Sequence, residues 1–192
     1  VATLIGQAIE QELINSQYST LDSFFPQYDI DYPEYVQLDD LLSMSSGYFD
    51  GYSDPPEFWY LATTEELLGM SHQDGPGAFF YNNSACHIHS HILYHGTGMT
   101  PKESANINLF PYLGFNNPDW NAGYNDINDG AASLMLNLRE MVKLGQLYLQ
   151  NGYSGENQII SSDWINESTS SQVETNWNWG YGYLWWLPER GY

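Results

Sequence analysis

Two glycines flank a proline at residues 75–77, and this tripeptide cannot continue a helix. It leads into residues 79–83, Phe-Phe-Tyr-Asn-Asn. Ser84 can then open a helix that runs to about His95 and ends at Gly96-Thr97-Gly98. An extended segment joined directly to a helix is therefore expected here, with Tyr81 and Asn83 at the junction.

Apolar residues recur with a helical period in several other segments. We expect helices over residues 1–15, 38–44, 57–70, 101–109 and 137–150, and a short helix opened by residues 161–164. In the helix 137–150, Asn137 and Glu140 form a predicted capping box, and Gly152 follows the end. Its predicted buried stripe is Leu138, Met141, Leu144, Leu147 and Tyr148.

The remaining segments are rich in Asp, Asn, Ser, Gly and Pro, which predicts loops over residues 16–37, 48–56 and 115–130 and a turn over 111–114. Residues 179–187 alternate aromatic and small side chains, as a strand does. With 192 residues, an apolar fraction of 42%, seven Trp and 16 Tyr, the chain can bury one hydrophobic core. These features predict a single α+β domain over residues 1–192.

The charge balance excludes two classes of partner. There are 24 acidic residues and four basic ones, for a formal net charge of −20. Nucleic acids and anionic membranes are bound through clustered Lys and Arg, so neither is an expected partner. An acidic surface also suits saline water, which favours a marine source. Cys86 is the single cysteine, so no disulfide forms within the chain.

Three stretches together resemble the family of class C β-lactamases, DD-peptidases and family VIII esterases. Residues 76–83, Pro-Gly-Ala-Phe-Phe-Tyr-Asn-Asn, are similar to the family element PG-x-x-F-x-Y-S-N. Residues 41–47, Leu-Leu-Ser-Met-Ser-Ser-Gly, resemble HLLTMTSG. Residues 129–152 resemble the stretch that begins GG-x-x-x-T and ends GQLYLNGG. The order and spacing match along nearly the whole chain.

The resemblance implies a β-lactamase or transpeptidase-like fold, of which this chain covers the helical region and a strand near its C-terminus. It also implies a serine hydrolase that acts on a small acyl substrate: a β-lactam, a D-alanyl peptide, an amide or an ester. Such enzymes combine Ser-x-x-Lys, Tyr-x-Asn and a Lys-Thr-Gly or His-x-Gly triplet. Tyr81 and Asn83 match the second element. The resemblance implies no cofactor or metal, and it favours a bacterial source and a periplasmic or secreted location.

The other two elements are missing from this sequence. Only Lys102 and Lys143 exist, and Met99 and Glu140 stand where Ser-x-x-Lys would need its serine. In the resemblance, that motif would lie just before Val1 and the triplet just beyond Tyr192, so we expect a truncated domain that is inactive alone. With no lysine beside it and acidic charge around it, Tyr81 should have a pKa at or above the usual value of about 10.

Alternatives remain for several residues. His87, His91 and His95, with His89 and Cys86 beside them, have a spacing that can bind zinc or copper, although a surface or partly buried histidine cluster is favoured. Asp126, Asn128 and Asp129 hint at calcium but lack the EF-hand glutamate. The aromatic residues 177–185 could stack on a sugar, although a packing face is favoured. Tyr81 can be an ordinary buried aromatic residue, and Asn83 a helix N-cap.

Two other functions compete with the hydrolase. The chain can be a non-catalytic binding or assembly module built on a degenerate hydrolase scaffold. Its apolar edge at residues 179–187 would then pair with another chain, so a homo-oligomer is expected. It can also be a histidine-metal protein, in which case a chelator would change its melting temperature.

Overall fold

The computed structural model describes residues 1–29, 35–49, 59–73 and 75–188. Within these residues the α-helices are α1 (Ala2–Glu10), α2 (Leu21–Phe24), α3 (Leu38–Leu42), α4 (Thr64–Leu68), α5 (Asn83–Thr97), α6 (Pro101–Asn108), α7 (Phe110–Leu113), α8 (Leu138–Leu149) and α9 (Ser162–Ser168). Two 3₁₀ helices are η2 (Trp59–Leu61) and η3 (Tyr124–Asp126). The strands are β1 (Tyr153–Ser154), β2 (Asn157–Gln158), β3 (Val173–Glu174), β4 (Gly180–Tyr181) and β5 (Trp186–Leu187). This mixture of helices and small sheets confirms the α+β class.

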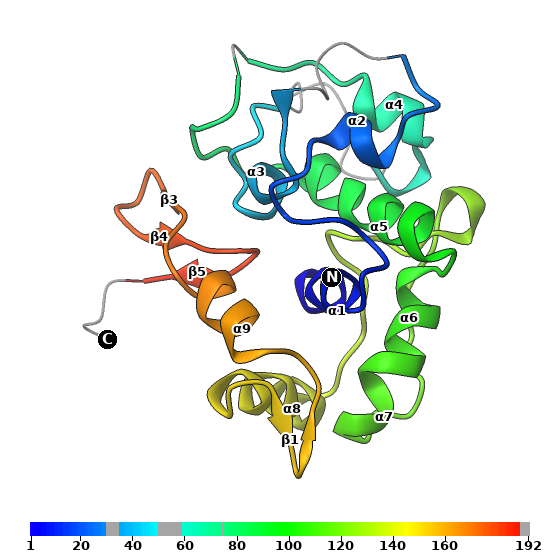
Figure 1. Cartoon of the computed structure of the whole chain (residues 1–192), viewed down its shortest axis with the longest axis vertical. Coiled ribbons are helices and arrows are strands. Elements are labelled where there is room, and N and C mark those ends of the chain that lie inside the picture. The colour runs from blue at the N-terminus through cyan, green and yellow to red at the C-terminus, as the bar shows by residue number, and fades with distance from the viewer. Residues whose placement is uncertain (30–34, 50–58, 74, 189–192) are drawn as a thin grey trace.

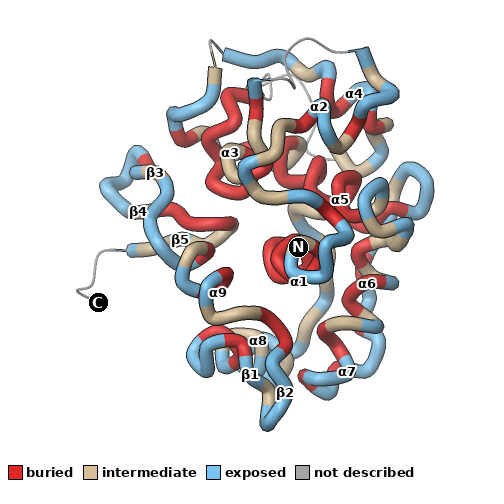
Figure 2. Tube along the Cα trace, in the orientation of Figure 1, coloured by how far each residue is buried: buried red, intermediate tan, exposed pale blue. Residues whose placement is uncertain are grey.

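The helix α1 lies in the middle of the molecule, with α6 on one side and α9 on the other (Figure 1). Most of its residues are buried, as Figure 2 shows. Gly6 allows this close packing, because a Cβ at that position would lie 2.5 Å from the indole of Trp164 in α9. The sequence pattern that predicted an amphipathic helix therefore marks the central element of the fold.

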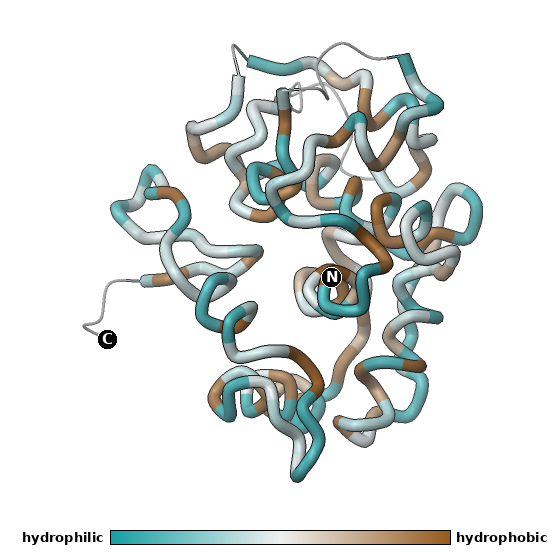
Figure 3. Tube along the Cα trace, viewed as in Figure 1, coloured by the Kyte–Doolittle hydropathy of each residue, from teal (hydrophilic) through white to brown (hydrophobic). Residues whose placement is uncertain are grey.

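The main hydrophobic core surrounds α1. Residues from helices that are distant in sequence meet there, including Ile5 of α1, Leu42 of α3, Ile88 of α5 and Ile165 of α9. Figure 3 shows hydrophobic positions through these inner segments and hydrophilic residues at the outer turns. Burial of this apolar surface is the main favourable term for the fold. No helix of the described residues is long and apolar enough to cross a membrane.

The strands form two small antiparallel sheets, a β1-β2 hairpin and a three-stranded sheet in the order β3-β4-β5. In the larger sheet, Val173 lies opposite Tyr181, and Tyr181 lies opposite Trp186. The prediction of one strand over residues 179–187 was wrong. The chain turns between β4 and β5 because the N–H groups of Tyr183 and Leu184 donate to carbonyls of distant segments, at Ser168 and Leu42, over 2.9 and 2.8 Å.

Several predicted boundaries also change. The first helix ends at Glu10, and Glu12 has a left-handed φ of 58°. The predicted helix 57–70 divides into η2 and α4, because Thr63 caps α4 in a capping box with Glu66. The predicted loop 16–37 contains α2, and the predicted turn 111–114 overlaps α7. Residues 30–34, 50–56 and 57–58 of these predictions lie outside the described residues.

The helix α8 confirms its predicted cap but only part of its predicted buried stripe. Asn137 and Glu140 form the capping box. Leu147 and Tyr148 are buried, whereas Leu138 and Met141 are 81% and 57% exposed. Leu138 and Leu147 lie about half a turn apart around the helix axis, so burying one side of α8 exposes the other.

Candidate active site

Two of the stretches that resemble the hydrolase family are hydrogen-bonded to each other. The N–H of Gly77 donates to the carbonyl of Ser45 over 2.7 Å, and that of Phe80 donates to the carbonyl of Met44 over 2.8 Å. Gly77 has φ of 128°, which favours glycine. The extended segment 75–82 is thereby fixed along the segment that follows α3, just before it enters α5.

The entrance to α5 is capped by Asn82. Its Oδ1 accepts the N–H of Ala85 over 2.8 Å, and its Nδ2 donates to the carbonyl of Tyr48 over 3.1 Å. The predicted cap at Asn83 was therefore wrong: Asn82 has extended backbone angles, whereas Asn83 is already the first helical residue. The half-buried Asn83 is thus not needed as the cap. Two adjacent asparagines gave no sequence signal to tell these roles apart.

The third stretch packs on the same helix. The carboxylate Oδ1 of Asp129 accepts the indole N–H of Trp59 over 3.0 Å and the backbone N–H of Ala131 over 2.9 Å. Next to it, Gly130 accepts the thiol of Cys86 over 3.4 Å through its carbonyl. All three family-like stretches therefore meet around the first turns of α5.

Tyr81 lies at the surface of this junction. Its side chain is 48% exposed, and its ring stacks on Trp186 of β5 with centroids 5.8 Å apart and planes inclined by 21°. Partial burial, and then the charge of Cys86, raise the pKa of Tyr81 above its ordinary value. The direction agrees with the sequence prediction, but the main cause is burial rather than net acidic charge. The phenol is therefore protonated at neutral pH.

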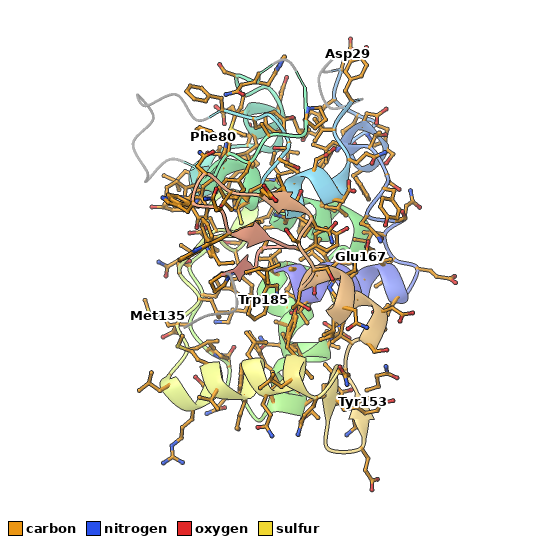
Figure 4. The ribbon with its side chains drawn as sticks, turned by 90° about the vertical axis from the view of Figure 1, so that its left-hand side faces the viewer. Asp29, Phe80, Met135, Tyr153, Glu167 and Trp185 are labelled. Carbon is orange, nitrogen blue, oxygen red and sulfur yellow. The ribbon has the colours of Figure 1, made fainter. Side chains whose placement is uncertain are left out.

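Trp186 was not singled out from the sequence as a neighbour of Tyr81. The register of β5 against β4 places it there, opposite Tyr181. Residues 177–185 also do not form one face: Tyr181 and Tyr183 are buried, whereas Trp177 and Trp179 are exposed. Phe80, on the segment that carries Tyr81, lies above the sheet in Figure 4.

Cys86 is a structural thiol of this site. Burial raises its pKa to about 12, so the nucleophilic thiolate is not populated at neutral pH.

The histidines of α5 are more buried than predicted. His87, His89 and His91 are fully buried, and only His95 is exposed. His87 and His91 are bonded to Gly130 and to Thr64 of α4, whereas Nδ1 of His89 donates to the carbonyl of Cys86 within α5 over 2.8 Å. In the described part of the chain, no group of three or more His, Cys, Asp or Glu side chains is arranged to hold a metal ion.

The side chains of the suggested calcium loop bind protein groups instead. Asn128 accepts the N–H of Lys102 over 2.9 Å and donates to the carbonyl of Trp120 over 3.1 Å. Asp129 accepts the bonds described above. These oxygens hold the loop against α6 and η2, which gives a structural reason for their presence.

This arrangement of a central helix, surrounding helices and a small sheet has the fold of serine β-lactamases and penicillin-binding proteins, as comparison with solved structures shows. Among solved structures, a class C β-lactamase from Rhodobacter sphaeroides matches with a TM-score of 0.75 and 18% identity, over 100% of this chain and 59% of that one. A β-lactamase from Sulfitobacter sp. EE-36 matches with a TM-score of 0.74 and 20% identity, over 100% and 57%.

An octameric penicillin-binding protein homologue from Pyrococcus abyssi matches with a TM-score of 0.70 and 17% identity, over 95% of this chain and 50% of that one. The chain thus spans between half and about three fifths of the length of these three proteins. No protein-family model matches the sequence, and no curated protein matches it. The similarity establishes the fold that the sequence motifs predicted.

Proposed function

We propose that this chain forms part of a serine acyl hydrolase of the β-lactamase, DD-peptidase and esterase type. Its substrate would be a β-lactam, a D-alanyl peptide, an amide or an ester. The observation that supports this proposal is the meeting of residues 41–47, 75–83 and 129–132 around the start of α5, which leaves Tyr81 at the surface. Tyr81 is the proposed general base, and Asn83 the proposed ligand of the acyl group.

The proposed chemistry needs a group that this chain does not supply. A serine hydroxyl attacks the carbonyl carbon only when a base removes its proton, and a protonated tyrosine cannot do so. A nearby lysine would stabilise the phenolate and lower the pKa of Tyr81. In the resembled family, Ser-x-x-Lys precedes the first helix. Such a segment, joined to the start of α1, would supply that lysine.

The first test is whether the chain alone turns over substrate. We expect the purified chain to hydrolyse nitrocefin and p-nitrophenyl acetate no faster than its Tyr81→Phe variant, because the protonated phenol has no activating cation. Hydrolysis that is clearly above buffer and is lost in Tyr81→Phe would refute the prediction of inactivity.

The second test concerns the acyl chemistry itself. The coding sequence upstream of Val1 is expected to encode Ser-x-x-Lys, and the longer protein should hydrolyse one of these substrates. Removing the base with Tyr81→Phe should lower kcat by roughly 10² to 10⁴. Tyr112→Phe is the matched control, because Tyr112 is 48% exposed and belongs to α7, away from this junction. Equal effects of the two variants would refute the role of Tyr81.

A second candidate function is a non-catalytic assembly module. The strand β5 pairs with β4 alone among the described residues, and an unpaired strand edge favours association. The penicillin-binding protein homologue named above is octameric. This candidate predicts a homo-oligomer by light scattering at micromolar concentration. A monomer would remove its main support and leave the hydrolase proposal intact.

A further inference from the structure

Aromatic rings gather around Trp186 on the three-stranded sheet. The ring centroids of Phe79, Tyr81, Trp177, Trp179 and Tyr181 all lie between 5.0 and 6.3 Å from that of Trp186. Three of the rings, those of Trp177, Trp179 and Trp186, line a cavity of about 760 Å³, called here the tryptophan pocket. Tyr81 stacks on Trp186, one wall of this pocket, but is not itself among the residues that line it.

The walls of the tryptophan pocket are held by the connection between β3 and β4. The hydroxyl oxygen of Thr175 accepts the backbone N–H of Trp177 over 3.4 Å and the backbone N–H of Trp179 over 3.3 Å. The N–H of Thr175 donates to the carbonyl of Trp179 over 2.8 Å. The two indoles are therefore set by a hydrogen-bonded turn, although they are 63% and 41% exposed.

The rings face the cavity at different angles. The plane of Trp177 is inclined by 56° to that of Trp186, and the plane of Trp179 by 84°. A ligand in the cavity therefore contacts indoles from several directions. Aromatic faces carry partial negative charge, and a cation within about 6 Å of a ring centroid is attracted to them. Indole is the strongest of the aromatic side chains in this respect.

The charge of the neighbouring sequence also favours a cation. From residue 144 to residue 188 the chain has no Lys or Arg but has Glu156, Asp163, Glu167 and Glu174, the last of these in β3 of the same sheet. Glu189 and Arg190 lie outside the described residues. Among the described residues no carboxylate lines the pocket, so these residues offer few acceptors to an ammonium group that must replace its bound water. A quaternary ammonium, which has no N–H to satisfy, fits this lining best.

We infer that the tryptophan pocket binds a quaternary ammonium group through the faces of Trp177, Trp179 and Trp186. This inference goes beyond the proposed function, because binding of the cation requires neither a nucleophile nor acyl transfer. A loss of binding and a loss of hydrolysis are measured separately, so failure of one proposal leaves the other standing.

The test compares choline with 3,3-dimethyl-1-butanol, a neutral molecule of the same shape, by calorimetry and tryptophan fluorescence on the whole chain. We expect choline to bind at least roughly five-fold more tightly, since the neutral molecule lacks the cation–π term. Trp177→Leu should weaken choline binding by roughly five-fold, whereas Trp177→Phe, which keeps a ring, should lose less.

The control variant is Tyr124→Leu, which removes a ring that is 42% exposed and lies in η3, outside the cluster. It should bind choline as the parent chain does. Near-ultraviolet circular dichroism checks that each variant keeps its fold, and Trp179→Leu gives an independent second variant. Equal affinity for choline and the neutral alcohol would overturn the inference. So would the absence of choline binding, including the case in which a second copy of the chain covers the rings.

Discussion

The N–H of Gly130 donates to Nδ1 of His87 over 3.1 Å, and this bond sets the tautomers of two buried histidines. A neutral His87 must then carry its proton on Nε2, which lies 3.3 Å from Nε2 of His91. His91 therefore accepts there and donates from Nδ1 to the hydroxyl of Thr64 over 2.8 Å. The Thr64 hydroxyl in turn donates to Nε2 of His95 over 3.4 Å.

This directed chain of hydrogen bonds bears on the histidine-metal alternative. A histidine binds a metal through a nitrogen lone pair. The Gly130 bond requires the proton on Nε2 of His87, and Nδ1 is already occupied as an acceptor. His87 can bind a metal only after this contact breaks, so the cluster is built for packing in the folded chain.

Replacing Gly130 with alanine should destabilise the protein. A Cβ on Gly130 would lie 2.7 Å from the carbonyl oxygen of Cys86 and 2.7 Å from Oγ of Ser90, both on α5. Relief of this overlap requires backbone movement, so we expect Gly130→Ala to lower the free energy of unfolding by about 1 to 3 kcal/mol in urea titrations. Gly145→Ala is the matched control, because its Cβ meets nothing within 4 Å in α8. It should stabilise by up to about 1 kcal/mol. Equal effects would contradict the packing of residue 130.

Stability should fall as the solution becomes acidic. Burial lowers the pKa of His87 and His89 to about 4 and that of His91 to about 3, from about 6.5 in the unfolded chain. Between pH 6.5 and 4 the unfolded state therefore binds more protons than the folded state. The contribution of these neutral histidines to the free energy of unfolding is complete above pH 6.5 and decreases as the pH falls. We expect the free energy of unfolding to fall by about 2 kcal/mol or more between pH 7 and pH 5. Urea titrations at each pH measure this loss.

Asp39 and Asp40 oppose this trend. Burial and then the charge of Asp40 raise the pKa of Asp39 to about 6, and burial also raises the pKa of Asp40. Two carboxyls do not cancel three histidines, so the net slope keeps its sign. His91→Gln, which removes one titrating group, should flatten the profile. A profile that is level from pH 7 to pH 5 would show that the histidines are not buried as described.

Asp39→Asn should stabilise the protein at pH 8. The carboxylate is charged there although burial disfavours the charge, and its buried Oδ1 has no hydrogen-bond partner. Because Asp39 is only half-buried, solvent screening limits the expected gain to about 1 kcal/mol, measured by thermal or urea unfolding. Asp40→Asn serves as the comparison, because this carboxylate, unlike Oδ1 of Asp39, has a hydrogen-bond partner. Oδ2 of Asp40 accepts the N–H of Gln37 in the cap of α3 over 2.8 Å. A destabilised Asp39→Asn variant would disprove the unfavourable charge.

Glu167→Ala should destabilise the protein by disconnecting three segments. Oε1 of Glu167 accepts the hydroxyl of Tyr18 over 2.8 Å, the hydroxyl of the buried Tyr183 over 3.1 Å and the amide of Gln17 over 3.1 Å. Removing the carboxylate leaves the Tyr183 hydroxyl without this acceptor, which costs about 1 to 3 kcal/mol. Glu174→Ala, at an exposed position of β3, should change the free energy of unfolding by less than about 0.5 kcal/mol. If both variants unfold at the same urea concentration, the network contributes nothing to stability.

Local interactions determined the parts of this protein that its sequence predicts well. The cap of α8 at Asn137 and Glu140 depends on residues three positions apart, so it is visible in the sequence. The break at Gly75-Pro76-Gly77 before α5 is likewise a local consequence of backbone chemistry. These features, with the motifs around them, were enough to predict the α+β class, the fold and the place of Tyr81 at a helix entrance.

Tertiary structure decided what depends on distant partners. The turn between β4 and β5 follows from hydrogen bonds to Ser168 and Leu42, and only this turn places Trp186 against Tyr81. The burial of His87 and His91 depends on Gly130 and Thr64, which lie 43 and 27 residues away in the sequence. The hydrophobic periodicity of the sequence shows which residues are apolar. Whether a residue is buried depends on which surfaces meet when the chain folds.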